Sequence, residues 1–99
     1  MPEKKDLKDE DLNKNLVLLS SLGEGEVGTI HSILGRTGMI NRLAAMGLAP
    51  GAEVKVLRNS WGPLIVLTAN TRVAIGRGQA SKILIAKDQV LSKKRKDSL

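Results

Sequence analysis

The chain has 99 residues, 41% of them hydrophobic and 26% charged, which is the size and balance of one small globular domain. It contains one Trp and no Phe or Tyr, so it lacks the aromatic side chains on which single-stranded nucleic acids stack, and the absence of Cys excludes disulfides and thiolate metal ligands. The charged N-terminal residues do not resemble a secretory signal, and no apolar run reaches the roughly 20 residues that span a bilayer. We therefore expect a cytoplasmic protein that meets a membrane only peripherally.

The formal net charge of +6 is distributed unevenly. Basic and acidic groups number four and five in residues 1–15, seven and three in residues 16–86, and five and two in residues 87–99. The composition predicts a flexible tail at 1–15, a folded domain at 16–88 and a basic flexible tail at 89–99. The basic run at 93–96 is either a solvated tail or a segment attracted to an anionic membrane surface or nucleic acid.

The folded domain begins with strands and a Gly-rich loop. Residues 16–19 can form a short strand, residues 20–25 predict a turn and a loop, and residues 27–34 predict a longer strand that ends at Gly35. The segment 23–28 matches the letters of a dinucleotide-binding fingerprint. Its context is wrong for that function, because it carries two Glu residues and runs into a strand instead of a helix.

A short amphipathic helix is predicted next, with Thr37 as its N-cap. Apolar residues fall within one arc at about 100° per residue, and they are Met39, Ile40, Leu43, Ala44 and Met46. Gly47 can take the left-handed conformation that ends a helix, Leu48 can fold back over the last turn, and Pro50-Gly51 supplies a tight turn. We therefore assign structural roles to Leu43, Met46, Gly47, Leu48, Pro50 and Gly51.

The remaining residues read mainly as strands with a period of two. Strands are predicted at 53–58, 64–68, 71–75 and 82–86. A tight turn falls at Ala69-Asn70, and residues 76–81 predict a bend or a single helical turn. About five short strands with one inserted α-helix indicate a mainly β protein that forms a small closed or half-closed barrel, with the helix plugging one end.

Alternation along these strands also predicts which side chains point outward. If Val54 and Val66 face the core, the outward apolar residues are Leu57, Ile65, Leu67 and, in the connection between the two strands, Trp61. Such an exposed patch usually marks a contact surface. The alternative is that strand 64–68 is covered on both faces, which its unbroken apolar run also fits.

The sequence shows no convincing catalytic or metal-binding constellation. His31 is the only histidine, and the carboxylates do not stand at a spacing typical of a tight transition-metal site. Metal binding is expected to be weak or shared between subunits, with His31 as the candidate ligand for Fe(II) or another divalent metal. Without a nucleophile beside a base, or paired carboxylates in an apolar setting, we expect a non-enzyme that requires no cofactor.

Several motifs resemble the FeoA family. They are Leu19-x-x-Leu22-x-x-Gly25, Gly28-x-Ile30, Arg42-Leu43-x-x-Met46-Gly47-Leu48-x-Pro50-Gly51-x-x-Val54-x-Val56, Gly62-Pro63-Leu64-x-Val66, and Val73-Ala74-Ile75 with Ala80-x-x-Ile83-x-Ile85. The resemblance covers residues 16–86. It implies a small cytosolic SH3-like barrel that accompanies FeoB, a membrane ferrous-iron permease with a cytosolic GTP-binding domain. The chain departs from the family pattern at Gly76-Arg77-Gly78, where many relatives carry a Leu-Arg pairing.

Protein docking is the function that this resemblance and the outward residues predict. The barrel would bind the cytosolic side of a FeoB-type permease through Leu57, Trp61, Ile65 and Leu67, with Arg36, Arg42, Arg58 and Arg72 as steering charges. One alternative is a small nucleic-acid-binding barrel, which a pI of about 10.0 favours and the scarcity of aromatic residues disfavours. Another is a metal-binding chaperone for Fe(II). The sequence leaves open whether the chain forms a homodimer and whether it activates or inhibits its partner.

Overall fold

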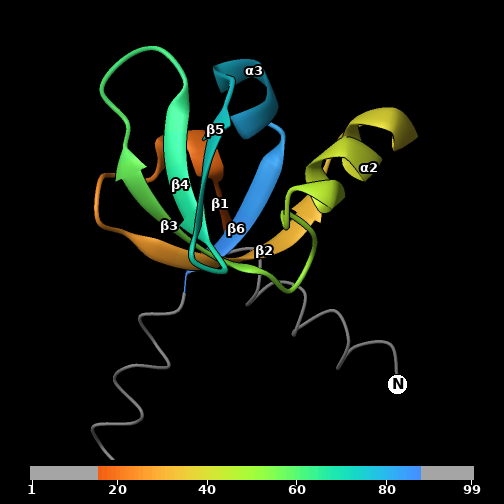
Figure 1. Ribbon diagram of the computed structural model, residues 1–99, viewed down its shortest axis with the longest axis horizontal. Helices are drawn as coiled ribbons and strands as arrows, with labels where there is room; N and C mark the ends of the chain where they lie inside the picture. Colours follow the sequence, from red (N-terminus) through yellow and green to blue (C-terminus); the bar gives the residue numbers. More distant parts are fainter. Residues whose placement is uncertain (1–15, 88–99) are drawn as a thin grey trace, which may run out of the picture.

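The structure is a computed structural model that describes residues 16–87, so the predicted tails and residue 88 lie outside the described residues. Strands follow one another with short helices between them (Figure 1). The elements are β1 Leu16–Leu18, the 3-10 helix η1 Leu19–Ser21, β2 Val27–Ile33, α2 Thr37–Ala45, β3 Glu53–Arg58, β4 Leu64–Thr68, β5 Thr71–Ile75, α3 Arg77–Ala80 and β6 Ile83–Lys87. Both ends of each predicted strand lie within one residue of the ends of an observed strand.

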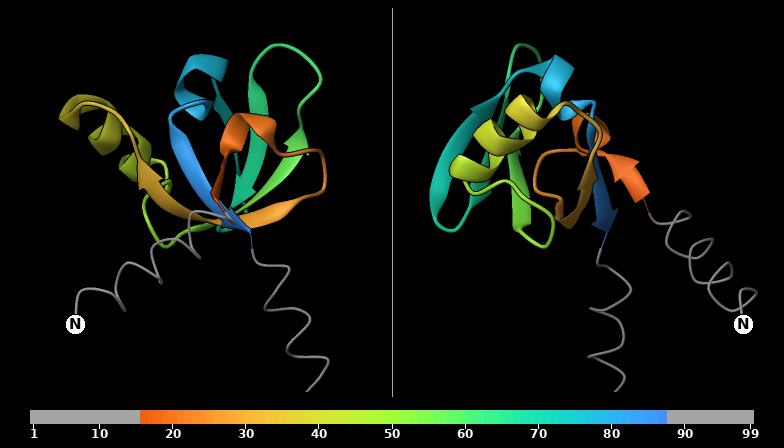
Figure 2. Two further views of the ribbon diagram at one scale, coloured as in Figure 1. Left: turned by 180° about the vertical axis from the view of Figure 1, so that it is seen from behind. Right: turned by 90° about the vertical axis from the view of Figure 1, so that its right-hand side faces the viewer.

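The strands form one antiparallel sheet of six strands in the order β1-β6-β2-β3-β4-β5. The sheet curls around its core, but its two end strands, β1 and β5, do not pair with each other (Figures 1 and 2). The prediction of a mainly β, half-closed barrel with one inserted helix is confirmed. All six strands correspond to predicted segments, so the estimate of about five strands was one too low; the short β1, predicted at 16–19, pairs with β6.

The core is entirely aliphatic and lies on the concave side of the sheet. The predicted inward residues Val54 and Val66 are buried, and Thr68 is the only buried polar residue among those described. The buried hydrophobic residues are Leu19, Leu22, Ile30, Leu43, Leu48, Val54, Val56, Leu64, Val66, Val73, Ile75, Ala80, Ile83 and Ile85. Alternate residues of β3 and β4 therefore face the core, as a strand period of two requires.

Helix α2 ends in a Schellman motif, as its Gly predicted. Gly47 has a φ of 91°, its N–H donates to Ala44 O at 2.9 Å, and Leu48 N–H donates to Leu43 O at 2.9 Å. Leu43 and Leu48 are both fully buried, so the turn anchors the C-terminal end of the helix in the core.

Three details of the helix prediction were wrong. The N-cap is Arg36, not Thr37, and no side chain caps it. Met46 is 42% exposed, so its structural role is limited to its backbone at the C-cap. The helix stands beside the barrel and does not plug its end (Figure 1). Leu43 is its only fully buried residue, and Met39 in its first turn is partly buried against the core.

The turn after the helix leads into β3 and also forms hydrogen bonds with β2. Gly51 has a φ of 95°, and Ala52 N–H donates to Ala49 O at 2.9 Å, as in a type II turn with Pro50 at its second position. Gly51 N–H donates to Ile30 O at 2.8 Å, and Ile30 N–H donates to Ala52 O at 2.8 Å. The turn therefore extends the pairing between β2 and β3.

Gly28 lies where β2 packs tightly against β6. A Cβ at this position would overlap Ile85 Cγ2 and lie 3.1 Å from Ala86 O. We expect Gly28→Ala to lower the free energy of unfolding by about 1–3 kcal/mol, because the strands would have to separate. Urea unfolding followed by circular dichroism measures this. The control is Gly38→Ala in α2, where nothing lies within 4 Å of the added Cβ. Equal stability of the two variants would contradict the prediction.

Candidate functional site

The outer face of strands β2 to β5 carries a row of side chains that crosses all four strands. The register places Val27 beside Lys55, Lys55 beside Leu67, and Leu67 beside Arg72. Val27 is 41% exposed and Leu67 is half-buried, whereas Lys55 and Arg72 are exposed. Apolar and cationic side chains therefore alternate along this row.

A β-bulge in β3 creates a second row next to the first. The pairing passes from Val56 opposite Val66 to Arg58 opposite Ile65, so Leu57 is the extra residue. Strict alternation would turn Arg58 toward the core. Because of the bulge, Arg58 is exposed and lines the same groove as Leu57 and Ile65. Ile65 in turn lies opposite Ala74 of β5.

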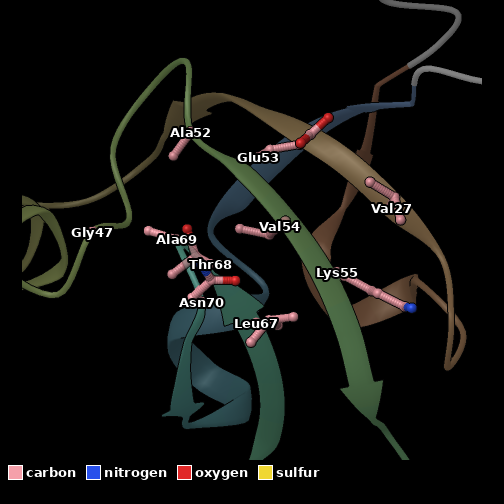
Figure 3. A pocket seen from close by; sticks show the side chains of 10 residues that line it. All are labelled: Val27, Gly47, Ala52, Glu53, Val54, Lys55, Leu67, Thr68, Ala69 and Asn70. Carbon is pink, nitrogen blue, oxygen red and sulfur yellow. The ribbon is translucent and has the colours of Figure 1, made fainter.

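We call these two rows the outer-face patch; its members are Val27, Lys55, Leu57, Arg58, Ile65, Leu67, Arg72 and Ala74. Two shallow grooves run over it. One is lined by Leu57, Arg58, Ile65, Arg72, Val73 and Ala74. The other runs from Val27 across Lys55 and Leu67 to the turn at Ala69 and Asn70 (Figure 3). Among the described residues that line either groove, Glu53 is the only acid, so the patch combines apolar side chains with interspersed cations.

The structure brings most of the predicted docking residues together. Leu57, Arg58, Ile65 and Arg72 share one groove, and Leu67 lines the other. Trp61 is 80% exposed in the loop between β3 and β4 and lines neither groove. The predicted steering residues Arg36 and Arg42 lie elsewhere, at α2, where they line a separate pocket with Gly35, Gly38, Met39 and Lys82.

Three members of the outer-face patch were not predicted from the sequence. Val27 and Ala74 could have been found by applying the two-residue alternation to β2 and β5, which places them on the outward side. The same alternation places Lys55 outward between Val54 and Val56, but it does not connect Lys55 with the apolar residues of the other strands. That connection needs the register between strands, which the sequence of a single strand does not contain.

The loop that carries Trp61 is held at its base by Asn59, another residue that sequence reasoning missed. Its side-chain oxygen accepts a hydrogen bond of 2.6 Å from Arg77 Nη2. Its side-chain Nδ2 donates to Ser20 O at 3.1 Å and to Leu22 O at 2.6 Å. Its backbone N–H donates to Glu24 Oε2 at 3.0 Å. Asn59 thus ties the end of β3 to η1, to the following loop and to α3.

His31 lies at a second β-bulge, on the exposed side of β2. The pairing passes from Ile30 opposite Ile85 to Ser32 opposite Leu84, and His31 is the extra residue. Its Nδ1 lies 3.1 Å from Ser32 Oγ. Within residues 16–87, no group of three or more His, Cys, Asp or Glu side chains is placed to hold a metal ion. Weak Fe(II) binding by His31 stays a prediction.

Glu26 closes the loop between η1 and β2. Its Oε1 accepts a hydrogen bond of 2.7 Å from Gly23 N–H, and its Oε2 lies 3.5 Å from Lys87 Nζ. The backbone hydrogen bond from Gly23, and to a smaller extent the charge of Lys87, lower the pKa of Glu26. The segment 23–28 is therefore a loop that leads into β2, as its context predicted, and it is held both by its own Glu26 and by hydrogen bonds between Gly25 N–H and Val56 O and between Val56 N–H and Glu26 O.

A family model described as the FeoA domain matches residues 17–87. The chain belongs to the FeoA family. This agrees with the motifs and with the barrel, and it associates the chain with ferrous iron transport. No helix within residues 16–87 is long and apolar enough to cross a membrane.

Relatives with known names support the assignment. A protein of Methanocaldococcus jannaschii named "Putative Fe(2+) transport protein A" is 42% identical over 62 residues, which cover 63% of this chain and 76% of the relative. A crystal structure of the iron uptake regulatory protein FeoA superposes with a TM-score of 0.70 at 38% identity, covering 73% of this chain and 97% of that one. FeoA of Stenotrophomonas maltophilia, described as an SH3 domain protein, shares the fold with a TM-score of 0.62 at 24% identity, covering 70% and 88% of the two chains.

Asn59→Ala should lower the free energy of unfolding by about 1–3 kcal/mol, because it leaves a carbonyl oxygen of the buried Leu22 without its donor. Urea unfolding measures the loss, and fluorescence anisotropy should show faster motion of Trp61. Asn41→Ala, an exposed position in the middle of α2, is the matched control and should cost nothing. Unchanged stability and anisotropy in the Asn59 variant would show that the network does not hold the loop.

Glu26→Gln tests the electrostatic part of the loop. Since the pKa of Glu26 is lower in the folded than in the unfolded state, its charge stabilises the fold above the unfolded value of 4.5, and this contribution is lost as the pH falls through the folded value. The wild-type protein should therefore have a higher urea midpoint of unfolding than the variant at pH 7. The difference between the two midpoints should shrink as the pH is lowered. Glu53→Gln removes an exposed carboxylate and is the control. A difference that stays constant with pH would refute the assignment.

Proposed function

We propose that the chain is a non-enzymatic, cytoplasmic accessory protein of ferrous iron uptake that docks through its outer-face patch on the cytosolic side of a FeoB-type permease. Membership of the FeoA family supports the pathway. The observation that carries the docking mechanism is the outer-face patch itself, in which Leu57, Ile65 and Leu67 lie on the outside of the barrel among three cations.

The patch has the properties of a docking surface. Leu57, Ile65 and Leu67 are half-buried and Val27 and Ala74 are exposed, so a partner that covers them removes further apolar surface from water. Lys55, Arg58 and Arg72 border these side chains and would attract an acidic partner, raising the rate of association. Because the patch sits on paired strands, little conformational entropy is lost when it binds.

Trp61 extends the docking surface beyond the sheet. A Trp that is 80% exposed contributes nothing to the core, whereas Trp and Arg are the residues that most often dominate binding energy at interfaces. The hydrogen bonds of Asn59 fix the base of its loop, so the indole is presented from an ordered support. In this proposal Trp61 is an anchor that inserts into the permease.

The basic pocket at α2 has a different part in the proposal. Arg36, Arg42 and Lys82 line it without an acidic residue, on a helix that stands away from the β3–β4 loop (Figures 1 and 2). Exposed charges at the border of an interface change association rates more than affinity. We assign Arg36 and Arg42 to steering, and the apolar contacts to the outer-face patch.

The test is the affinity of the full chain for the purified cytosolic domain of the permease. The combined substitutions Trp61→Ala and Ile65→Asp should weaken binding by about tenfold or more, since both an anchor and the centre of the apolar row are lost. Trp61 is the only Trp in the chain, so the Trp fluorescence of the chain reports on this residue alone. Its fluorescence emission should shift to shorter wavelength when the wild-type complex forms, because the indole leaves water.

A matched pair of changes on another exposed apolar surface serves as control. Leu34→Ala and Met46→Asp alter residues that are 56% and 42% exposed near α2, outside the outer-face patch. We expect this double variant to bind like wild type. Undiminished binding by the Trp61 and Ile65 variant, with its fold intact by circular dichroism, would eliminate the proposed surface.

A further inference from the structure

Strand β5 has a free backbone edge next to the outer-face patch. It is the last strand in the sheet order, and among residues 16–87 its only strand neighbour is β4. Its pairing with β4 is regular over all five residues, without a bulge. In the right-hand view of Figure 2, β5 (teal) runs along the outer margin of the barrel.

The register identifies which backbone groups point away from β4. Ala69 and Asn70, with φ values of 49° and 64°, form a two-residue turn, so the flanking Thr68 and Thr71 make a hydrogen-bonded pair. Such pairs alternate along an antiparallel ladder. Arg72 and Ala74 therefore fall at the non-hydrogen-bonded positions, and their N–H and C=O groups face away from β4.

These groups are available for pairing. Both Arg72 and Ala74 are exposed, and no hydrogen bond from the described part of the chain reaches the free side of either residue. Native sheets usually protect an end strand with a proline, a bulge or an inward-pointing charge. Residues 71–75 contain none of these, because the inward residues are Val73 and Ile75 and the pairing is unbroken.

The side chains beside this edge determine what could pair with it. The groove next to β5 is lined by two arginines, Arg58 and Arg72, and by apolar side chains, without an acid. A strand added to β5 would place every second side chain on this outer face. Acidic side chains there would lie next to Arg72 on β5, with Arg58 farther along the same groove. A second copy of the chain fits less well, because β5 paired with β5 would bring like charges at Arg72 close together.

We propose that β5 pairs with an extended acidic segment of the partner, about five residues long, which continues the sheet beside Arg72 and Ala74. The inference rests on the proposed docking function and adds the conformation and charge of the partner segment. Main-chain hydrogen bonds to Arg72 and Ala74 give the segment its position, and the Arg72 side chain beside it selects its acidic side chains.

Amide hydrogen exchange of the full chain tests the edge directly. In the free chain the amides of Arg72 and Ala74 should exchange fast, whereas those of Val73 and Ile75, bonded to β4, should exchange slowly and serve as internal controls. Adding the cytosolic domain of the permease should slow Arg72 and Ala74 by about tenfold or more. Slow exchange in the dilute free chain, or slowing with chain concentration alone, would overturn the proposal, since the chain itself or a second copy would occupy the edge.

A substitution separates pairing from surface contact. Ala74→Pro removes an outward N–H without removing a bond to β4, and Ala74→Ser keeps that N–H. Proline should weaken binding of the permease domain by about tenfold or more, and serine by less than about twofold. If Ala74→Pro binds like wild type while the Trp61 and Ile65 variant does not, strand addition is wrong and the docking surface stands.

A peptide probe keeps the inference testable if the permease domain does not bind at all, which would be a failure of the proposed function. A five-residue peptide of alternating Glu and Val should shift the amide resonances of Arg72 and Ala74, and the same peptide with Lys in place of Glu should not. Absence of these shifts with both the domain and the acidic peptide would overturn the proposal.

Discussion

The packing of aliphatic side chains inside a curled sheet is the constraint on which the rest of this structure depends. Without Phe or Tyr, the core is filled by Leu, Ile, Val and Ala, and buried residues occupy alternate positions in β3, β4, β5 and β6. Packing is tight, and at Gly28 the side chain of Ile85 and the backbone of Ala86 leave no room even for a methyl group. The same alternation sends the intervening residues outward, so the core and the outer-face patch result from one pattern.

The sequence was sufficient to predict the elements whose signals are local. Strand alternation, Gly47 after the helix and the Pro50-Gly51 turn act within a few residues, and each produced the predicted local structure. The bulges at His31 and Leu57 could not be predicted, because a bulge is a property of two paired strands. Contacts over long sequence separations, such as those of Asn59, give no periodic signal either.

The bulge at Leu57 shows how such a hidden feature changes the candidate site. The simple pattern correctly placed Leu57 outward, but it would have put Arg58 on the core side. With the extra residue, both side chains line one groove with Ile65. Arg58 was predicted to be a docking residue from its charge alone. The bulge explains why its side chain lies beside the apolar row.

In the proposed function, one sheet would offer two kinds of recognition side by side. The outer-face patch offers apolar area and positive charge, and β5 offers unpaired backbone groups at its border. Neither requires catalytic chemistry, which agrees with membership of a family associated with ferrous iron transport.

The graded burial along α2 has a consequence for how its two ends would tolerate change. Leu43 and Leu48 are fully buried at its last turn, Met39 is partly buried against the core, and Arg36, Thr37 and Gly38 at its start are exposed. Residues added before Met39 would therefore extend the exposed start of the helix without displacing a core side chain. The beginning of α2 is thus where this chain can gain length or charge at the least structural cost.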